Sequence, residues 1–446
     1  MLRRSGGLCY NSINMAGLNE TPRGNRIHIA FFGLRNAGKS TLVNAFTGQN
    51  LAIVSDVPGT TTDPVSKAME ILPLGPCLVT DTAGLDDEGE LGRQRVEKTL
   101  KVLETTDIAV WVSGEKEEGK TKSEKVSREK FLDACQRRRV VVLEFRRGDS
   151  VEELKRKIAA VKLGEPTPGL LDGLVAAGDR VVCVVPIDES APKGRLILPQ
   201  QQVIRECLDR HVVCTVCQPE ELFDCSDCSD CSDCSIAGGR GARRLVITDS
   251  QAFGTVNEVV TRLNQSIEQS NNLNNQNNPP IVLTSFSILF ARQKGDLDEY
   301  VKGLAAIRTL KDGDTVLVAE GCTHHRQCND IGSVKIPKAL KKLSGKDLKF
   351  VFSSGSGFLD SCASLTSGRE TASTLAGEIG QSNNQNNPNS RTIEQFSLIV
   401  HCGGCMQTRR EMLRRIALAR EAGIPIVNYG ILLAAANGID VERVVV

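Results

Sequence analysis

The chain has 446 residues, and its 55 basic and 54 acidic side chains give a formal net charge of +1. This length predicts two to four domains, and the balanced charge excludes the broad basic surface that a nucleic-acid partner would require. No run of eighteen apolar residues is present, so no membrane span is expected. The sixteen cysteines come without the apolar core of a signal peptide, which indicates thiols and ligands rather than a disulfide framework.

The first 24 residues precede the first predicted strand. They contain Arg3 and Arg4 and no acidic residue before Glu20. This pattern is compatible with a short organellar presequence, and a disordered cytosolic tail is the alternative.

Apolar strands alternate with helical segments in the stretch that follows. The glycine-rich turn after residues 26–33 leads into a helical segment, and a charged helix follows residues 139–145. Strands are predicted at 26–33, 77–81, 108–113 and 139–145. The alternation predicts an α/β domain with a doubly wound parallel sheet over residues 25–165.

Two further α/β units are predicted after a linker rich in proline and glycine at residues 164–169. The first spans residues 170–297 and the second residues 298–446. Their predicted strands lie at 179–188, 244–249, 315–320, 396–400 and 424–428, and residues 281–297 form a further apolar segment.

Three low-complexity tracts interrupt these units, at residues 224–235, 269–280 and 381–390. Because such polar tracts bury too little apolar surface to offset their ordering entropy, we expect disordered loops. The first tract, DCSDCSDCSDCS, is interpreted as a repeat expansion rather than a metal site, because no regular element fixes its thiols.

The segment GLRNAGKS, from Gly33 to Ser40, matches the GxxxxGK[ST] phosphate-binding loop and lies between a predicted strand and a predicted helix. Its backbone amides would donate to the phosphates, Lys39 would neutralise their β and γ oxygens, and Ser40 would bind Mg²⁺. The expected nucleotide-binding residues in this loop are Gly33, Asn36, Ala37, Gly38, Lys39, Ser40 and Thr41.

Two more phosphate-sensing motifs follow in the order typical of a GTPase. Residues 56–64, DVPGTTTDP, form a threonine-rich loop in which Thr61 would reach Mg²⁺. The motif Asp81-Thr-Ala-Gly84 comes next; Asp81 would hold the metal's water shell and Gly84 would let the backbone meet the γ-phosphate. The three motifs together predict a GTP-hydrolysing P-loop domain in which Lys39, Thr61, Asp81 and Gly84 support catalysis.

The guanine-reading motif NKxD is not intact. The residues at its position are Arg146, Arg147, Gly148 and Asp149. Asp149 can still accept hydrogen bonds from the N1 and N2 donors of guanine, but the asparagine and lysine are missing, so the sequence specifies the base weakly.

Two positions in the nucleotide motifs resemble the family of the tRNA-modification GTPase TrmE. Leu85 stands where many small GTPases have a water-orienting glutamine, and Asn36 stands where that family holds potassium. The stretch Gly59-Thr-Thr is also similar to that family's switch. The resemblance implies that K⁺, rather than a glutamine or an arginine finger, assists hydrolysis.

Cysteine and histidine residues follow two predicted strands of the last unit, in the segments Cys322-Thr-His324 and His401-Cys-Gly-Gly-Cys405. The carboxyl ends of parallel strands meet at one edge of a sheet, where ligands bind. Three cysteines with nearby histidines can hold zinc or an iron–sulfur cluster, while CxxC alone also suits a redox dithiol or small residues in a turn. The candidate ligands are Cys322, Cys402 and Cys405, with His324 and His401 as further candidates.

The chain resembles the HydF family, the maturation GTPases of FeFe hydrogenase. The matching segments are GLRNAGKS, PGTTTDPV, DTAGLDDEGELG, VPIDESAPKGRLILPQ, LTSFSILFARQKGDL, EGCTHH, DIGSVKIP, HCGGCM and IPIVNYG. They cover nearly everything from residue 26 onward except the low-complexity tracts. The damaged NKxD box and the long spacing between Cys322 and Cys402 depart from the family pattern.

The resemblance implies a scaffold. A 4Fe–4S cluster would be held by Cys322, Cys402 and Cys405 with an exchangeable fourth position, which His324 or His401 would occupy or adjoin. Two radical-SAM maturases would build a di-iron precursor on this scaffold, which would then deliver it to apo FeFe-hydrogenase. Residues 170–297 would dimerise the protein, and residues 298–446 would carry the cluster.

Two other classes of function stay open on the residues alone. One is a potassium-dependent GTPase of tRNA modification or ribosome assembly with zinc at the cysteines, and the other is a protein–protein switch with inert cysteines. With the resemblance, the arginine-bearing start favours a hydrogenosome or another organelle matrix, and the cytoplasm or a plastid is the alternative.

Overall fold

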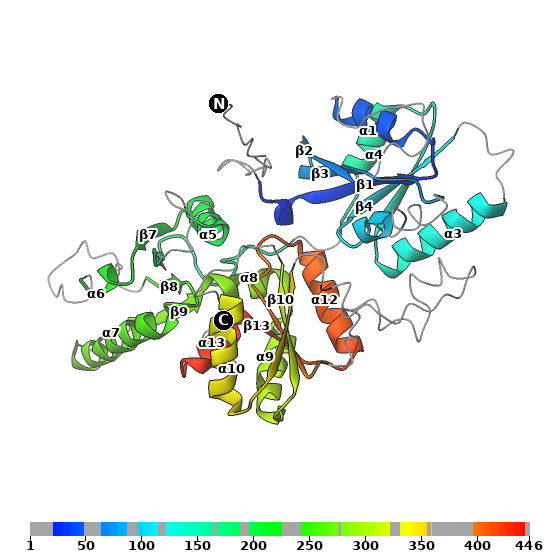
Figure 1. Ribbon diagram of the computed structural model, residues 1–446. Helices are drawn as coiled ribbons and strands as arrows, with labels where there is room; N and C mark the ends of the chain where they lie inside the picture. Colours follow the sequence, from blue (N-terminus) through cyan, green and yellow to red (C-terminus); the bar gives the residue numbers. More distant parts are fainter. Residues whose placement is uncertain are drawn as a thin grey trace, which may run out of the picture.

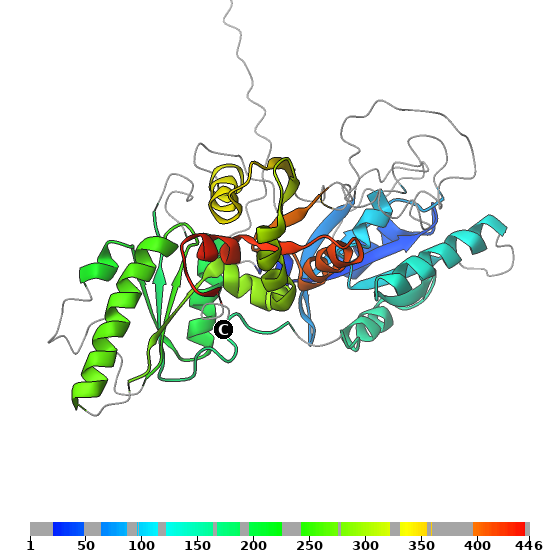
Figure 2. The same cartoon turned by 90° about the horizontal axis from the view of Figure 1, so that it is seen from below.

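The computed structural model describes residues 21–48, 64–86, 96, 98–114, 122–163, 167–187, 196–224, 242–274, 278–321, 331–354, 358 and 396–441 (Figure 1). They form three α/β units, called here the G domain, the middle domain and the C-terminal domain. Figure 2 shows the C-terminal domain between the other two, with the middle domain at one end and the G domain at the other.

The G domain contains a five-stranded sheet of order β2-β3-β1-β4-β5. A short 3₁₀ turn (Arg23–Asn25) precedes it. Its elements are β1 (Ile27–Gly33), α1 (Lys39–Thr47), β2 (Val65–Ile71), β3 (Gly75–Asp81), β4 (Ile108–Ser113), α3 (Lys122–Arg137), β5 (Val141–Arg146) and α4 (Val151–Ala159). Four strands are parallel as predicted, but β2 pairs antiparallel with β3. Sequence reasoning missed β2 because its exposed edge position leaves charged side chains in an otherwise alternating strand.

Helices cover both faces of this sheet, which confirms the doubly wound arrangement. Phe31 of β1 packs against Phe46 of α1 on one face, and its neighbour Phe32 packs against Phe131 of α3 on the other. Because both faces are buried, β1 reads as a continuous apolar run rather than an alternating one. The last residue of β1, Gly33, therefore enters the phosphate-binding loop from a fixed position.

The middle domain has a parallel four-stranded sheet of order β7-β6-β8-β9. Its elements are β6 (Arg180–Val184), α5 (Leu198–Asp209), β7 (Val213–Cys217), α6 (Glu221–Asp224), β8 (Arg244–Thr248), α7 (Phe253–Asn274), β9 (Ile281–Ser285) and α8 (Phe286–Lys294). The expectation that residues 269–280 form a disordered loop is wrong for residues 269–274, which end α7. The helix is already nucleated there, and Asn271 bonds the backbone N and O of Asn278 at 2.9 Å each.

The C-terminal domain has a second parallel four-stranded sheet, of order β11-β10-β12-β13. Its elements are α9 (Leu297–Ala306), a 3₁₀ turn (Ile307–Thr309), β10 (Thr315–Glu320), a π turn (Ile331–Lys335), α10 (Ile336–Ser344), β11 (Lys349–Ser354), β12 (Leu398–His401), α12 (Arg409–Glu421), β13 (Ile426–Asn428) and α13 (Tyr429–Ala436). Strands β10 and β12 are adjacent and parallel, with Ala319 opposite His401. The carboxyl ends that precede the two cysteine motifs therefore lie side by side, as predicted.

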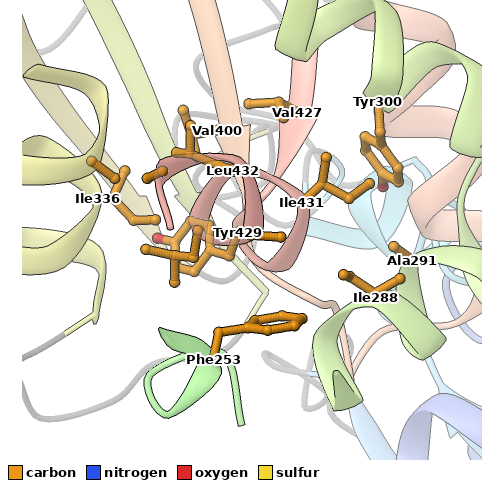
Figure 3. Packing of buried hydrophobic residues seen from close by; sticks show 14 of the residues in the cluster. Phe253, Ile288, Ala291, Tyr300, Ile336, Val400, Val427, Tyr429, Ile431 and Leu432 are labelled. Atoms are coloured by element: carbon orange, nitrogen blue, oxygen red, sulfur yellow. The ribbon is translucent and has the colours of Figure 1, made fainter. Parts of the chain in front are cut away.

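The middle and C-terminal sheets share one hydrophobic core. Figure 3 shows Phe253 of α7 and Ile288 of α8 close to Tyr429 and Ile431 of α13. Helix α13 is apolar on all sides because it is buried between the two units. The two domains therefore form one packed body, and α8 runs from the middle sheet into the C-terminal domain.

Candidate functional site

The phosphate-binding loop has the backbone shape that an anion cradle needs. Asn36 and Gly38 both adopt positive φ angles, of 57° and 90°, and Gly38 caps α1. A side chain at Gly33 is excluded, since its Cβ would lie 2.4 Å from the carbonyl oxygen of Val112. These conformations turn successive amides toward the helix N-terminus, which favours phosphate binding.

Ser40 and Asp81, the two residues predicted to hold the magnesium shell, are brought together by the fold. Ser40 Oγ donates a 2.6 Å hydrogen bond to Asp81 Oδ2. Asp81 is fully buried, and its other oxygen, Oδ1, has no hydrogen-bond partner among the described residues. Burial raises the pKa of this carboxyl, while Ser40 and Lys39 lower it. A buried carboxylate oxygen beside a serine hydroxyl fits Mg²⁺, which takes one or two protein oxygens and keeps water.

Lys39 lies at the mouth of the loop. Its Nζ donates to the backbone oxygens of Leu34 at 2.7 Å and Gly33 at 3.2 Å. These contacts hold the ammonium in the phosphate-binding loop, where it would meet the β and γ oxygens of a bound nucleotide.

Gly84 of the DTAG motif packs directly on the phosphate-binding loop. A Cβ at Gly84 would lie 2.6 Å from Arg35 Cγ and 3.0 Å from Arg35 N. The same amide of Arg35 donates a 2.6 Å hydrogen bond to Asp86 Oδ1. Asp86 thus ties the two motifs together, a role that sequence reasoning missed although Asp86 lies in the conspicuous segment after DTAG.

Two of the other residues predicted to bind nucleotide, Asp149 and Thr41, are exposed to solvent. Asp149 lies in the exposed turn after β5, where its Oδ2 accepts a 2.8 Å hydrogen bond from Arg146 N. Thr41 is exposed in the first turn of α1, next to Ser40. Thr61 lies outside the described residues, and the potassium role of Asn36 stays a prediction.

The loop after β12, residues 402–407, is called here the cysteine loop. Its first thiol, Cys402 Sγ, accepts a 3.0 Å hydrogen bond from the amide of Gly321, the residue just before Cys322. Cys402 N donates to Ala319 O at 3.0 Å, which continues the β10–β12 ladder. Cys405 lies on the same loop, whereas Cys322 and His324 lie outside the described residues. The fold therefore brings Gly321, the residue that precedes the first cysteine motif, into contact with Cys402 of the second.

Two glycines next to Cys402 and Cys405 pack closely against neighbouring side chains. A Cβ at Gly321 would lie 2.7 Å from Gln407, and a Cβ at Gly404 would lie 2.7 Å from Met412 Sδ. Burial raises the pKa of the Cys402 thiol to about 11, while amide donors from Gly321 and Gly404 lower it. Amide donors to sulfur and close backbone approach suit cysteines that ligate an iron–sulfur cluster. No group of three metal-binding side chains is complete within the described ranges.

His401, at the end of β12, has both ring nitrogens engaged. Nδ1 donates to the carbonyl oxygen of Cys402 at 2.8 Å, and Nε2 accepts from Arg415 Nη1 at 2.9 Å. Arg415 is fully buried and its Nη2 also bonds Glu411 at 2.8 Å. Burial and the guanidinium lower the pKa of His401 to about 3. His401 is thus held as a support for the cysteine loop, and its role as an iron ligand stays a prediction that would require one of these bonds to exchange.

A buried lysine binds the backbone carbonyls of the cysteine loop. Lys294, the last residue of α8, donates to the backbone oxygens of Gln407, Cys405 and Gly404. Sequence reasoning missed this residue, because its only signal is a lysine at the end of an otherwise apolar segment. Polar atoms near Cys402 and Cys405 therefore come from several elements, among them β10, α8, α12 and β13.

No described helix is long and apolar enough to cross a membrane.

The chain is similar to several known GTPases over part of its length. The tRNA modification GTPase MnmE of Zymomonas mobilis is 28% identical over 184 residues, which cover 41% of this chain and 38% of that protein. GTPase Der of Xylella fastidiosa is 48% identical over 90 residues, 19% of each chain. The chain thus spans less than half the length of these curated relatives. Among solved structures, Aquifex aeolicus Era with GDP and AlF4⁻ aligns at 18% identity and a TM-score of 0.23, covering 42% of this chain and 91% of that chain.

A family model matches each of the three domains. The 50S ribosome-binding GTPase model matches residues 28–145. The hydrogen maturase F dimerization domain matches residues 170–295, and its tetramerization domain matches residues 298–366 and 370–446. These two domains together cover more than half of the chain. Their succession behind a P-loop GTPase domain means that the chain belongs to the HydF family of hydrogenase maturation GTPases.

Proposed function

We propose that this hydrogenase maturation GTPase is a scaffold that holds a 4Fe–4S cluster at Cys322, Cys402 and Cys405 and delivers a di-iron precursor to apo FeFe-hydrogenase. The observation that carries the proposal is the hydrogen bond from Gly321 N to Cys402 Sγ, because Gly321 directly precedes Cys322 in the chain. The buried side chains of Lys294 and Arg415 are positively charged and lie close to the cysteine loop. They favour a negatively charged ligand at this site, and a cluster bound by three thiolates is negatively charged.

The cargo follows from the same proposal. Radical-SAM maturases would supply the di-iron precursor, and the cluster would offer it an exchangeable fourth position. Such a labile position suits a carrier, which must release what it binds. The chain's own residues position the thiols and donate hydrogen bonds to sulfur, while the cluster would supply the site at which the precursor attaches.

GTP turnover would regulate exchange of partners rather than drive bond making. The support is the contact between α12, which begins just after the cysteine loop, and the base of the G-domain sheet, where Arg410 meets Asp107. Lys39, Ser40 and Asp81 would bind GTP with Mg²⁺, and Asn36 would bind the assisting K⁺. We also infer a hydrogenosomal or other organellar site of action from the proposed task.

The test is anaerobic iron reconstitution of the full chain, followed by visible absorption and EPR. We expect a 4Fe–4S signal in the wild type, its loss or strong weakening in Cys402→Ala, and no change in Cys135→Ala, a buried cysteine of the G domain. Uptake of zinc without iron by the wild type would overturn the scaffold proposal and favour a zinc-containing GTPase of RNA modification instead.

A further inference from the structure

Lys294 has an unusual position for a lysine. It is 1% exposed, and its Nζ lies 2.7 Å from Gln407 O, 3.1 Å from Cys405 O and 3.4 Å from Gly404 O. An ammonium group has three N–H donors, and here each can meet one carbonyl of the cysteine loop. The same Nζ also lies 5.1 Å from the ring centroid of Phe290.

The charge of Lys294 has no direct counter-ion in the part of the chain that the structure describes. None of the ion pairs found there, within 4.0 Å, involves Lys294. A buried ammonium without a partner is costly, and carbonyl dipoles offset only part of that cost.

Neutral packing alone would not select this arrangement. A methionine would fill the same space at the end of α8 without a desolvation penalty. The site instead has a positively charged side chain at three backbone carbonyls of the cysteine loop, one of which belongs to Cys405. Such a charge is compensated when the loop above it carries negative charge.

We propose that Lys294 is a positioning residue of the metallocluster: it fixes the cysteine loop through three carbonyls and stabilises the added electron when the cluster is reduced. This inference rests on the proposed function, because it presupposes a cluster at Cys402 and Cys405. A nearby positive charge favours the reduced, more negative state of an iron–sulfur cluster, and net charge is one of the terms that set its reduction potential.

The experiment is an EPR-monitored redox titration of the reconstituted full chain. Lys294→Met removes the charge and the donors, Lys294→Gln removes the charge but keeps an amide donor, and Lys294→Arg keeps the charge. Lys302→Met is the matched control, because Lys302 is an exposed lysine of α9, the next helix in the chain, and is paired with Glu299. Iron content and melting temperature are measured on every variant.

We expect the midpoint potential to become more negative in Lys294→Met and Lys294→Gln, and to stay near the wild-type value in Lys294→Arg and Lys302→Met. Equal potentials in all variants that hold a cluster would overturn the inference and leave Lys294 a purely structural residue, even if iron content fell. A wild type that takes up no iron would overturn both the inference and the proposed function, so the two failures are distinguishable.

Discussion

Arg410 Nε and Asp107 Oδ1 lie 3.0 Å apart and join the start of α12 to the residue before β4 in the G domain. The same guanidinium donates through Nη1 to the backbone oxygens of Arg139 at 3.1 Å and Thr106 at 3.3 Å. One helical turn later, Arg414 contacts Glu104. Because α12 begins directly after the cysteine loop, one helix links that loop to the G domain.

The first prediction concerns this link. In a double-mutant cycle, Arg410→Ala and Asp107→Asn should show a coupling of about 1 kcal/mol in the free energy of unfolding, because both side chains are largely buried at the contact. Denaturant unfolding measures it. Arg420→Ala, an exposed arginine in the last turn of α12, is the control and should show no coupling with Asp107→Asn. Additive single effects for Arg410 and Asp107 would mean that the ion pair does not hold the domains.

The second prediction concerns the metal shell of the nucleotide site. Ser40→Ala and Asp81→Asn should each lower Mg²⁺-dependent GTP hydrolysis by about 100-fold, since each removes an oxygen or a charge aimed at the metal. Phosphate release at saturating GTP is the measurement. Thr47→Ala, whose hydroxyl bonds Val43 O within the same helix, should leave the rate unchanged.

A third prediction tests the base reader. Asp149→Asn should weaken GTP binding by about tenfold and improve the binding of xanthosine triphosphate, because an amide can donate to the 2-oxo group of xanthine. Competition against a fluorescent nucleotide gives both affinities. If the two affinities do not move in opposite directions, Asp149 does not read the base, and the altered NKxD box has lost this role.

The fourth prediction is a pH dependence. Burial lowers the pKa of His28, whose Nε2 lies 3.1 Å from Arg23 O. The unfolded chain therefore binds a proton near pH 6.5, whereas the folded chain keeps His28 neutral to lower pH. The free energy of unfolding should fall as the pH drops below about 6.5, by at most about 1.4 kcal/mol per pH unit for this group. His401 contributes in the same direction.

Urea unfolding between pH 7 and pH 5 measures this effect. His28→Gln should flatten the decline relative to the wild type. His211→Asn is the control, because asparagine tolerates the positive φ of 55° at that position. An unchanged slope in His28→Gln would contradict the assignment.

The fifth prediction concerns dimerisation. Strand β7 lies at the edge of the middle sheet, and Val213 and Val216 on it are 57% and 45% exposed. An unpaired edge with exposed valines, in a region matched by a dimerization domain, fits a second copy of the chain. Val213→Lys with Val216→Lys should lower the oligomeric state of the protein in light scattering. Val126→Lys, at an exposed valine of α3, should leave the oligomeric state unchanged.

The sequence alone determined much of the framework. Each of the functional motifs follows a continuous apolar segment, which is the sequence pattern of a buried parallel strand. This pattern located the phosphate-binding loop, the DTAG motif and the two cysteine motifs at predicted strand ends. Strands β7 and β11 escaped prediction because both lie at sheet edges and are only partly buried. Residues 269–274, at the end of α7, were predicted to be a loop because their composition is polar and of low complexity. They are helical because the preceding turns of α7 continue into them.

Only the tertiary structure decided which distant residues meet. Lys294 reaches the cysteine loop because the middle and C-terminal sheets share one core, and Arg410 reaches Asp107 because α12 packs on the base of the G-domain sheet. Single charged residues carry no periodic signal, so their partners are fixed by the packing of whole units. Local patterns in the chain therefore define the motifs, while the supports that hold the cysteine loop arise from contacts between domains.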